Sequence, residues 1–417
     1  MKVAILGAGI AGLSTAYLLK QKHAHQFTLF EESNAIGGMA KTFTWHDFQC
    51  DLAPHRLFTN QASLLEEFLA LVPMNKIRRR SRIFIQGKWI RDPVNAVEIV
   101  AKFFPGRSAS IVYHYLVRRQ YPETSFNALA LNKFGKGLNE FFFKPYSEKL
   151  FGIPADQISP HWGRQKIRVG GIADMIRRNS KLYFSYFYYP KQHGYGAICN
   201  RLYQDVRPCT RLNTRLTNLR YDPTARIFHC TFNQNGQTVH DSFDTVVSSL
   251  PLPDVARFFD LHLPMHYRPA TITYLLINKP RVSPCHWFYV ADSHLMLNRV
   301  AEFKNFSESD LPPETTVLCC EVTNRSRHSV NAVVAELVST GLIRSEDVLD
   351  STVREMPRAY PIYDLAYERH MKEVKTFFTN VPNFYHLGRN AQFAHQDVDE
   401  IYAGAKKVVD DIIARVS

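Results

Sequence analysis

Three glycines near the amino terminus constrain this chain more than any other feature. Gly7, Gly9 and Gly12 lie inside the apolar run KVAILGAGIAGLSTAYLL of Lys2–Leu19, and a second apolar run ends at Glu31. The segment therefore predicts a strand, a glycine turn, a helix and a second strand. In such a unit the first glycine permits a tight turn, the second leaves room beside the backbone, and the third lets the helix lie close to the strand.

This spacing is typical of a site for the pyrophosphate of a dinucleotide. The helix amino terminus offers free N–H groups and a partial positive charge to the phosphates. Glu31 follows Gly12 by 19 residues, the separation expected when its carboxylate accepts a hydrogen bond from a ribose hydroxyl. The alternatives are a chance glycine triplet and the apolar core of a secretory signal. The three spaced glycines, the lack of a convincing cleavage site and the strand that follows favour the dinucleotide site.

The composition indicates an ordinary globular protein. The 417 residues are 45% hydrophobic and 21% charged, which fits two or three domains and argues against disorder. Apart from the glycine-punctuated start, no apolar run approaches the ~20 residues that span a bilayer. The seven cysteines are an odd number and include no CxxC pair, so we expect reduced thiols, a cytoplasmic location and no zinc or other metal site.

The charge balance is strongly basic. Lysine and arginine exceed aspartate and glutamate by 51 to 38, which gives a net charge of +13. This excess indicates an anionic ligand or surface, and it is compatible with a sugar nucleotide, porphyrin carboxylates or a peripheral membrane contact. The densest cluster, KIRRRSR at 76–82, fits a solvated strand edge as well as an anion site. Nucleic acid is not expected as a partner, because no known nucleic-acid module is present.

Periodicity and turn signals predict the organisation of the rest of the chain. Helices are expected over Ala62–Leu71, most of 94–188, Val330–Leu342 and from about Asp397 to Val416. Hairpin turns are expected at Gln86-Gly87 and Asn235-Gly236, and buried strands at Thr245–Leu250, Thr271–Ile277 and Thr316–Val322. We interpret Phe141, Phe142 and Phe143 as core residues.

The opening motif, Gly37-Gly38 six residues after Glu31, and several later segments together resemble one family. The later segments are DLAPHRLFT at 51–59, RRSRIFIQGKWI at 79–90, FFFKPYSEKLFG at 141–152, YYPKQHGYG at 188–196, NRVAEFKNFS at 298–307, AYPIYD at 359–364 and HLGRNAQFAHQDVDEI at 386–401. They are similar to the FAD-dependent amine oxidase and protoporphyrinogen oxidase superfamily, in a bacterial group close to UDP-galactopyranose mutase. The first and last motifs are specific for FAD.

The resemblance implies a mixed α/β fold, with a glutathione-reductase-like Rossmann domain for FAD and an intertwined substrate domain of helices and sheet. We expect the FAD-binding domain to comprise residues 1–75, 190–260 and 360–417, and the substrate domain 76–189 and 261–359. The implied cofactor-binding residues are Gly7, Gly9, Gly12, Glu31, Gly38, Met39, Leu216, Gly388, Arg389 and Asp397. Gly388 and Arg389 would lie beside the flavin ring, and Leu216 would contact adenine through its backbone.

Other positions match residues near the substrate of the mutase. The implied catalytic residues are His55, Arg299, Tyr360 and Arg389, and the implied substrate-binding residues are Tyr146, Phe151, Lys166, Arg168, Arg299 and His395. Arg299 coincides with an arginine that pairs with a diphosphate, for which a guanidinium fork is well shaped. His55 lies in the loop that would face the flavin, although a lone histidine is equally compatible with a local structural role. Tyr146 and Tyr360 also fit simple packing.

Three departures from the mutase fall in its substrate site. Phe151 replaces a tryptophan, a second arginine is replaced by Lys166 or displaced to Arg168, and His395 replaces a tyrosine. The leading prediction is therefore an oxidoreductase that passes a hydride from a small anionic substrate to flavin N5. The alternative is a non-redox mutase in which reduced flavin N5 attacks the anomeric carbon of a sugar nucleotide. A binding protein with a structural or lost FAD is disfavoured by the intact glycines.

Overall fold

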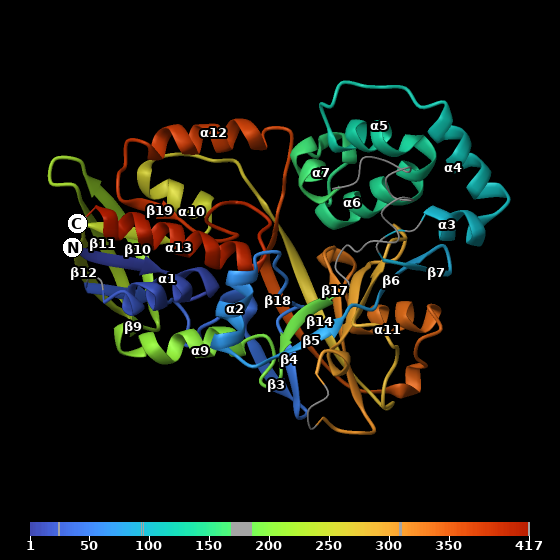
Figure 1. Cartoon of the computed structure of the whole chain (residues 1–417), viewed down its shortest axis with the longest axis horizontal. Coiled ribbons are helices and arrows are strands. Elements are labelled where there is room, and N and C mark those ends of the chain that lie inside the picture. Colours follow the sequence, from blue (N-terminus) through green and yellow to red (C-terminus); the bar gives the residue numbers. More distant parts are fainter. Residues whose placement is uncertain (24–25, 93, 95, 168–185, 308–310, 416–417) are drawn as a thin grey trace.

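The computed structural model describes residues 1–23, 26–92, 94, 96–167, 186–307 and 311–415. These residues form a mixed α/β fold with two main sheets, which lie side by side in Figure 1 with a separate group of helices, α3–α7, above the second sheet. No helix in this part of the chain is long and apolar enough to cross a bilayer.

The first sheet is parallel and is covered on both faces. Its order is β19 (Phe384–His386), β13 (Thr245–Ser248), β1 (Lys2–Leu6), β2 (Gln26–Phe30) and β9 (Thr210–Arg211). Val3 and Ile5 of β1 pack in the core with helices α1 (Ile10–Gln21), α9 (Ala197–Val206) and α13 (Val398–Ala414). Ala4 and Leu6 pack against the antiparallel sheet of β10 (Thr214–Asp222), β11 (Ile227–Gln234) and β12 (Gln237–Phe243). Burial on both faces explains why β1 reads as a continuous apolar run.

The second sheet is mixed. Its order is β18 (Val348–Pro361), β14 (Tyr267–Ile277), β17 (Thr316–Val322), β16 (Leu297–Glu302), β15 (Trp287–Val290), β6 (Ser81–Ile85) and β7 (Lys88–Arg91). Helix α11 (Val330–Ser339) packs on this sheet. The remaining elements include β3 (Thr42–Trp45), β4 (Phe48–Asp51), α2 (Ala62–Leu71), β5 (Met74–Arg78), β8 (Tyr186–Pro190), α10 (Leu252–Ala256) and α12 (Tyr367–Phe378). β17 is buried along its whole length although it contains one charged residue, Glu321.

The helical group consists of α3 (Ala96–Phe103), α4 (Gly106–Leu116), α5 (Phe126–Leu138), α6 (Lys144–Phe151) and α7 (Pro160–Lys166). A π-helical turn, Asn139–Phe143, joins α5 to α6. Because a π turn contains more residues than an α turn, it changes the faces on which the following side chains lie. Phe141 is buried in the core, as predicted, but Phe142 and Phe143 line a cavity. Both also pack against the core cluster that contains Phe141, so the core interpretation is confirmed for Phe141 and incomplete for the other two.

Most of the elements predicted from the sequence are confirmed. The strand–turn–helix–strand unit, the helix Ala62–Leu71, both hairpins and the carboxyl-terminal helix are present within a few residues of the expected bounds. The basic cluster lies on β5, β6 and their connection, where Arg79 pairs with Asp92 and stacks on Trp287. The predicted domain limits stay predictions.

Candidate active site

A cavity of about 1070 Å³ extends between the first sheet, the second sheet and the helical group. It brings together segments from both ends of the chain and from its middle. The predicted residues that line it are Gly7, Gly9, Glu31, Gly38, Met39, His55, Tyr146, Lys166, Arg299, Tyr360, Gly388, Arg389, His395 and Asp397. The convergence of these positions on one cavity makes it the candidate active site.

One end of the cavity is formed by the glycine turn between β1 and α1. Gly7 has a φ of +93°, and a Cβ on Gly12 would lie 1.9 Å from the carbonyl oxygen of Gly7. The tight turn and the close helix–strand approach predicted for these two glycines are therefore confirmed. A Cβ on Gly9 would meet nothing closer than Gly38 Cα at 3.9 Å, so the backbone is open to the cavity. Helix α1 starts here without a side-chain cap, which leaves backbone N–H groups for a ligand.

Glu31 fixes the shape of this turn. Its Oε2 accepts a hydrogen bond from Ala8 N at 2.8 Å, and its Oε1 accepts hydrogen bonds from the backbone N and the hydroxyl of Ser33 at 3.0 and 2.7 Å. The carboxylate therefore connects the end of β2 to the glycine turn while it lines the cavity. A carboxylate has about four lone-pair sites, so capacity for a further donor remains.

The carboxyl-terminal segment returns to the same place. Gly388 has a φ of +96°, and a Cβ there would lie 2.8 Å from the Cβ of Ala11 on α1. Asp397 is the N-cap of α13, as expected, and its N–H donates to Glu400 at 2.9 Å. Arg389 lies over the ring of Tyr360, 5.1 Å from its centroid. Burial lowers the pKa of Arg389, so its charge is poorly solvated.

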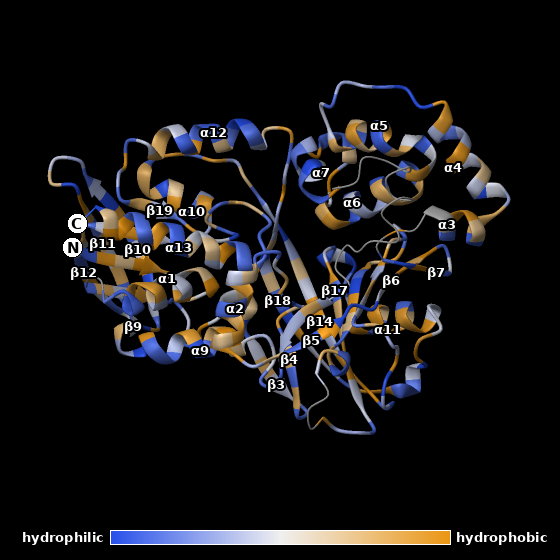
Figure 2. Cartoon of the chain, in the orientation of Figure 1, coloured by the Kyte–Doolittle hydropathy of each residue, from blue (hydrophilic) through white to orange (hydrophobic). Residues whose placement is uncertain are grey.

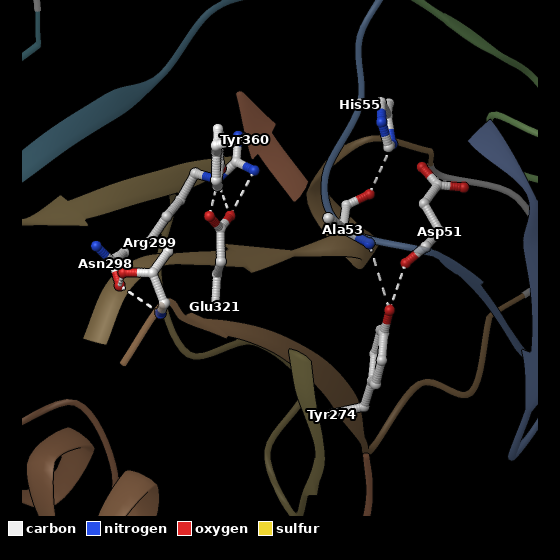
Figure 3. A network of polar contacts seen from close by, with 9 residues as sticks. Asp51, Ala53, His55, Tyr274, Asn298, Arg299, Glu321 and Tyr360 are labelled. Atoms are coloured by element: carbon white, nitrogen blue, oxygen red, sulfur yellow. Dashed lines mark hydrogen bonds and ion pairs between the residues drawn. The ribbon is translucent and has the colours of Figure 1, made fainter. Parts of the chain in front are cut away.

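A hydrogen-bonded network forms the opposite end of the cavity (Figure 3). Nε and Nη2 of Arg299 donate to Oε2 of Glu321 at 3.0 and 2.6 Å, and the hydroxyl of Tyr360 donates to Oε1 of the same carboxylate. Burial opposes the charge on Arg299, but Glu321, Tyr360 and Tyr289 together outweigh it and raise the pKa of the guanidinium. Burial and the Glu321 charge raise the pKa of Tyr360. The guanidinium fork predicted for a diphosphate is thus engaged by a carboxylate.

Glu321 was missed by sequence reasoning. It is 2% exposed, lines the cavity, and lies directly across from Arg299 in the β16–β17 register. A signal was present, because Glu321 is the one charged residue in TVLCCEV, and a charge in a buried strand requires a partner.

His55 is held by a short polar loop. Its Nδ1 lies 2.8 Å from the carbonyl oxygen of Ala53, which can only accept, so Nδ1 carries the proton and Nε2 is the acceptor of the neutral ring. Burial, with further contributions from Arg299 and Arg389, lowers the pKa of His55 to about 4. The loop is anchored by Tyr274, whose hydroxyl donates to the carbonyl oxygen of Asp51 at 2.7 Å (Figure 3). His55 is therefore neutral near pH 7.

His395 lies in a part of the cavity that several cations line. Burial lowers its pKa well below the ordinary value, and the charges of Arg389, Lys166 and Arg299 act in the same direction. Its ring is parallel to that of Tyr360, with centroids 6.1 Å apart. Lys166 lies over the ring of Trp162 at 5.5 Å. Because three neighbouring cations disfavour the protonated form of His395, the electrostatic potential there is positive. A positive potential would stabilise an anionic group.

Some predicted residues are not brought to the cavity wall. Phe151 is 1% exposed and meets Trp162 edge-on at 4.9 Å, because α6 turns it into the core behind that tryptophan. Leu216, on β10, packs against the core beneath the first sheet and does not line the cavity. Arg168 lies outside the described residues. Tyr146 does line the cavity, edge-on to Tyr289 at 6.0 Å.

Several polar atoms of the cavity wall are buried without a hydrogen-bond partner among the described residues. They include Nε and Nη2 of Arg389, Nδ1 of His395, Oε1 of Gln165, Oδ1 of Asn390 and Oε1 of Gln396. Such atoms cost about 1–3 kcal/mol each unless a ligand satisfies them. With the open glycine turn at the other end, the donor and acceptor set fits an elongated ligand that carries a diphosphate and a polar ring, as FAD does.

Comparisons with known proteins agree with this geometry. Residues 5–70 match the model of the NAD(P)-binding Rossmann-like domain, and residues 108–385 match that of the flavin containing amine oxidoreductases. An L-amino-acid oxidase of Naja atra is 25% identical over 66% of this chain and 58% of its own length. An L-amino-acid oxidase of Crotalus adamanteus is 42% identical over 16% of this chain and 12% of its own length. The matched part thus covers about half of the first relative and much less of the second.

Solved structures show the same fold. Reduced UDP-galactopyranose mutase superposes with a TM-score of 0.85 at 18% identity, over 99% of this chain and 94% of that protein. A protein of Exiguobacterium sp. assigned as a protoporphyrinogen oxidase gives 0.76 at 15% identity, over 99% and 98%. A putrescine oxidase variant gives 0.68 at 15% identity, over 99% of both chains.

Proposed function

Because the chain belongs to the flavin-containing amine oxidoreductase family, we propose that it is an FAD-dependent oxidoreductase that takes a hydride from a small anionic substrate. The single observation that carries this proposal is the continuous cavity, with an open glycine turn at one end and a cationic, partly unsatisfied wall at the other. A flavin supplies the hydride acceptor, which explains why the proposal needs no nucleophilic side chain.

The chain's own residues would hold the cofactor in three places. The N–H groups at the start of α1 would bind the pyrophosphate, beside Gly7 and Gly9. Glu31 would accept a hydrogen bond from a ribose hydroxyl. Arg389 would donate its unpartnered Nε and Nη2 to oxygen or nitrogen acceptors at the ring end.

The substrate would occupy the part of the cavity near His395. Arg389 and Lys166 give this region a positive potential, which would orient an anionic group, while the charge of Arg299 is balanced by Glu321. The aromatic wall of Phe142, Tyr146 and other rings would exclude water from the reacting carbon. His55 and His395 would act as neutral hydrogen-bonding groups, since both pKa values are lowered.

An anaerobic single-turnover experiment tests the proposal. Purified protein, reconstituted with FAD if needed, would be mixed with a panel of amino acids, amines and carboxylates, and the flavin absorbance would be followed. We expect one substrate class to bleach one flavin per chain, and Arg389→Met to slow bleaching while the exposed Arg354→Met does not. Bound FAD that no member of the panel reduces, but that UDP-galactose perturbs, would contradict the proposal.

A mutase acting on a sugar nucleotide is the second candidate, favoured by the cations around His395. It predicts that UDP-galactose is converted only after the flavin is reduced, and that the flavin is still reduced at the end. The oxidoreductase predicts a stoichiometric change of oxidation state. The ion pair between Arg299 and Glu321 weighs against the mutase, because Nε and Nη2 of Arg299 already donate to the Glu321 carboxylate.

A further inference from the structure

Helix α4 exposes its apolar face, which a helix in a globular protein normally buries. Ala109, Val112, Tyr113 and Leu116 follow the i, i+3, i+4, i+7 spacing of an apolar stripe. All four are exposed, with Leu116 at 73% and Tyr113 at 61%. The face that packs on the protein is marked instead by Ser108 and Ile111. The stripe therefore has no partner among the described residues.

Two further exposed hydrophobic residues lie next to the ends of the helix. Phe104 precedes the helix and Val117 follows it, and both are exposed large hydrophobic residues. We call the set Phe104, Val112, Tyr113, Leu116 and Val117 the α4 stripe. Figure 1 places α4 at the outer edge of the helical group, and Figure 2 shows that it carries hydrophobic residues as well as hydrophilic ones there. Contiguous exposed apolar surface of this kind marks an interaction site.

The charged side chains within the α4 segment itself are of one sign. Between Glu98 and Glu123 the sequence contains Lys102, Arg107, Arg118 and Arg119 and no acidic residue. Arg107, Arg118 and Arg119 are exposed at the two ends of α4. Two copies that met through this face about a twofold axis would bring these like charges together. An anionic surface would neutralise them.

We propose that the α4 stripe docks on a bilayer that contains anionic lipid, with the side chains of the stripe inserted among the headgroups and the arginines bound to lipid phosphates. A helix with an apolar face, aromatic residues and arginines at its margins has the composition of an interfacial helix. The same helical group supplies Phe142, Phe143 and Tyr146 to the cavity wall, so docking would hold the cavity close to the membrane surface. This inference does not depend on the proposed reaction.

Vesicle flotation tests the proposal with the full-length protein. We expect it to float with phosphatidylcholine vesicles that contain about 30% phosphatidylglycerol, to float weakly with phosphatidylcholine alone, and to lose binding in high salt. Val112→Ser/Leu116→Ser and Arg118→Gln/Arg119→Gln should each lower the bound fraction about fivefold or more. Leu349→Ser/Leu365→Ser is the matched control, because these leucines are 53% and 55% exposed elsewhere, and it should bind as the unchanged protein does. Thermal unfolding of each variant checks that it is folded.

Two results would overturn the proposal. The first is a folded protein that does not float with the anionic vesicles at low salt, or whose flotation both α4 variants leave unchanged. The second is a dimer, seen by light scattering without vesicles, that Val112→Ser/Leu116→Ser converts to a monomer. That result would assign the stripe to a second copy of the chain.

Discussion

The glycine end of the cavity is made of backbone, whereas the opposite end is made of side chains from distant strands. At the glycine end Gly7, Gly9 and Gly12 act through the absence of a Cβ, and their partner Glu31 is close in sequence. At the other end Arg299, Glu321 and Tyr360 meet because β16, β17 and β18 belong to one sheet. The glycine end depends on local backbone shape, and the side-chain end depends on the alignment of strands. Mutations at the two ends should therefore impair folding and binding in different ways.

The largest effect is expected at the glycine end. Gly12→Val would place carbon atoms against the carbonyl oxygen of Gly7, which lies 1.9 Å from a Cβ position, and neither backbone can move without separating β1 from α1. We expect no folded, flavin-loaded protein. Gly106→Ala is the control, since a Cβ there meets nothing within 4 Å. Circular dichroism and the flavin spectrum measure both, and a yellow, folded Gly12→Val protein would contradict the importance of this contact.

At the side-chain end the main cost should be an unpaired charge. Glu321→Ala leaves Arg299 without its carboxylate, which we expect to lower the free energy of unfolding by about 3 kcal/mol. Arg299→Met/Glu321→Ala should cost less than the sum of the single changes, because neither charge is then left alone. Urea unfolding of the unchanged protein, of Arg299→Met, of Glu321→Ala and of the double variant gives the coupling energy. Additive costs would mean that the two residues act independently.

Low pH should also destabilise the folded protein, through His55 at the side-chain end of the cavity. His55 has a folded-state pKa of about 4 against an ordinary 6.5, so between these values the unfolded chain binds more protons and unfolding becomes more favourable as the pH falls. A histidine shifted this far contributes up to about 2 kcal/mol of instability at pH 5. His55→Gln should flatten the pH dependence of unfolding between pH 6.5 and 4. The exposed His240→Gln should not, and equal slopes for both variants would refute this assignment.

The smallest effect is expected for the carboxylate at the glycine end. Glu31→Gln keeps the shape of the side chain but replaces one acceptor oxygen by a donor, so Ala8 N or Ser33 loses its partner. We expect a loss of about 1 kcal/mol in stability and weaker FAD binding by titration. Glu66→Gln is the control, because Glu66 is exposed and does not line the cavity. Equal FAD affinities for the two variants would leave Glu31 with a structural role alone.

The difference between the two ends also explains what sequence could predict. The glycine unit, α2 and the Asn235-Gly236 hairpin depend on neighbours within a few tens of residues, and their patterns are complete in the local sequence. The pairing of Arg299 with Glu321 depends on a strand register that no local pattern encodes. It engages two nitrogen atoms of Arg299, whose predicted contact with a diphosphate stays a prediction.

The positions of three phenylalanines were also predicted imprecisely, and the reasons lie in their local packing. The π turn Asn139–Phe143 interrupts the regular helical period, so Phe142 and Phe143 could not be assigned to the correct face. Phe151 aligned with a ligand-facing position by resemblance, yet it is buried in contact with Trp162, which lines the cavity where Phe151 does not. The resemblance pointed to most of the segments that line the cavity. Which side chains form its wall could be determined only from the packing in the structure.

The order of the strands in the first sheet has a consequence for biosynthesis. β1 lies between β2 and β13, and the sheet is completed only by β19, while Gly388 closes on the start of α1. A nascent chain emerges from the ribosome amino terminus first, so the glycine turn is synthesised long before its last neighbours exist. If the chain binds FAD as proposed, stable capture must await translation of β19 and Gly388, and a product truncated before residue 388 should leave the ribosome without FAD.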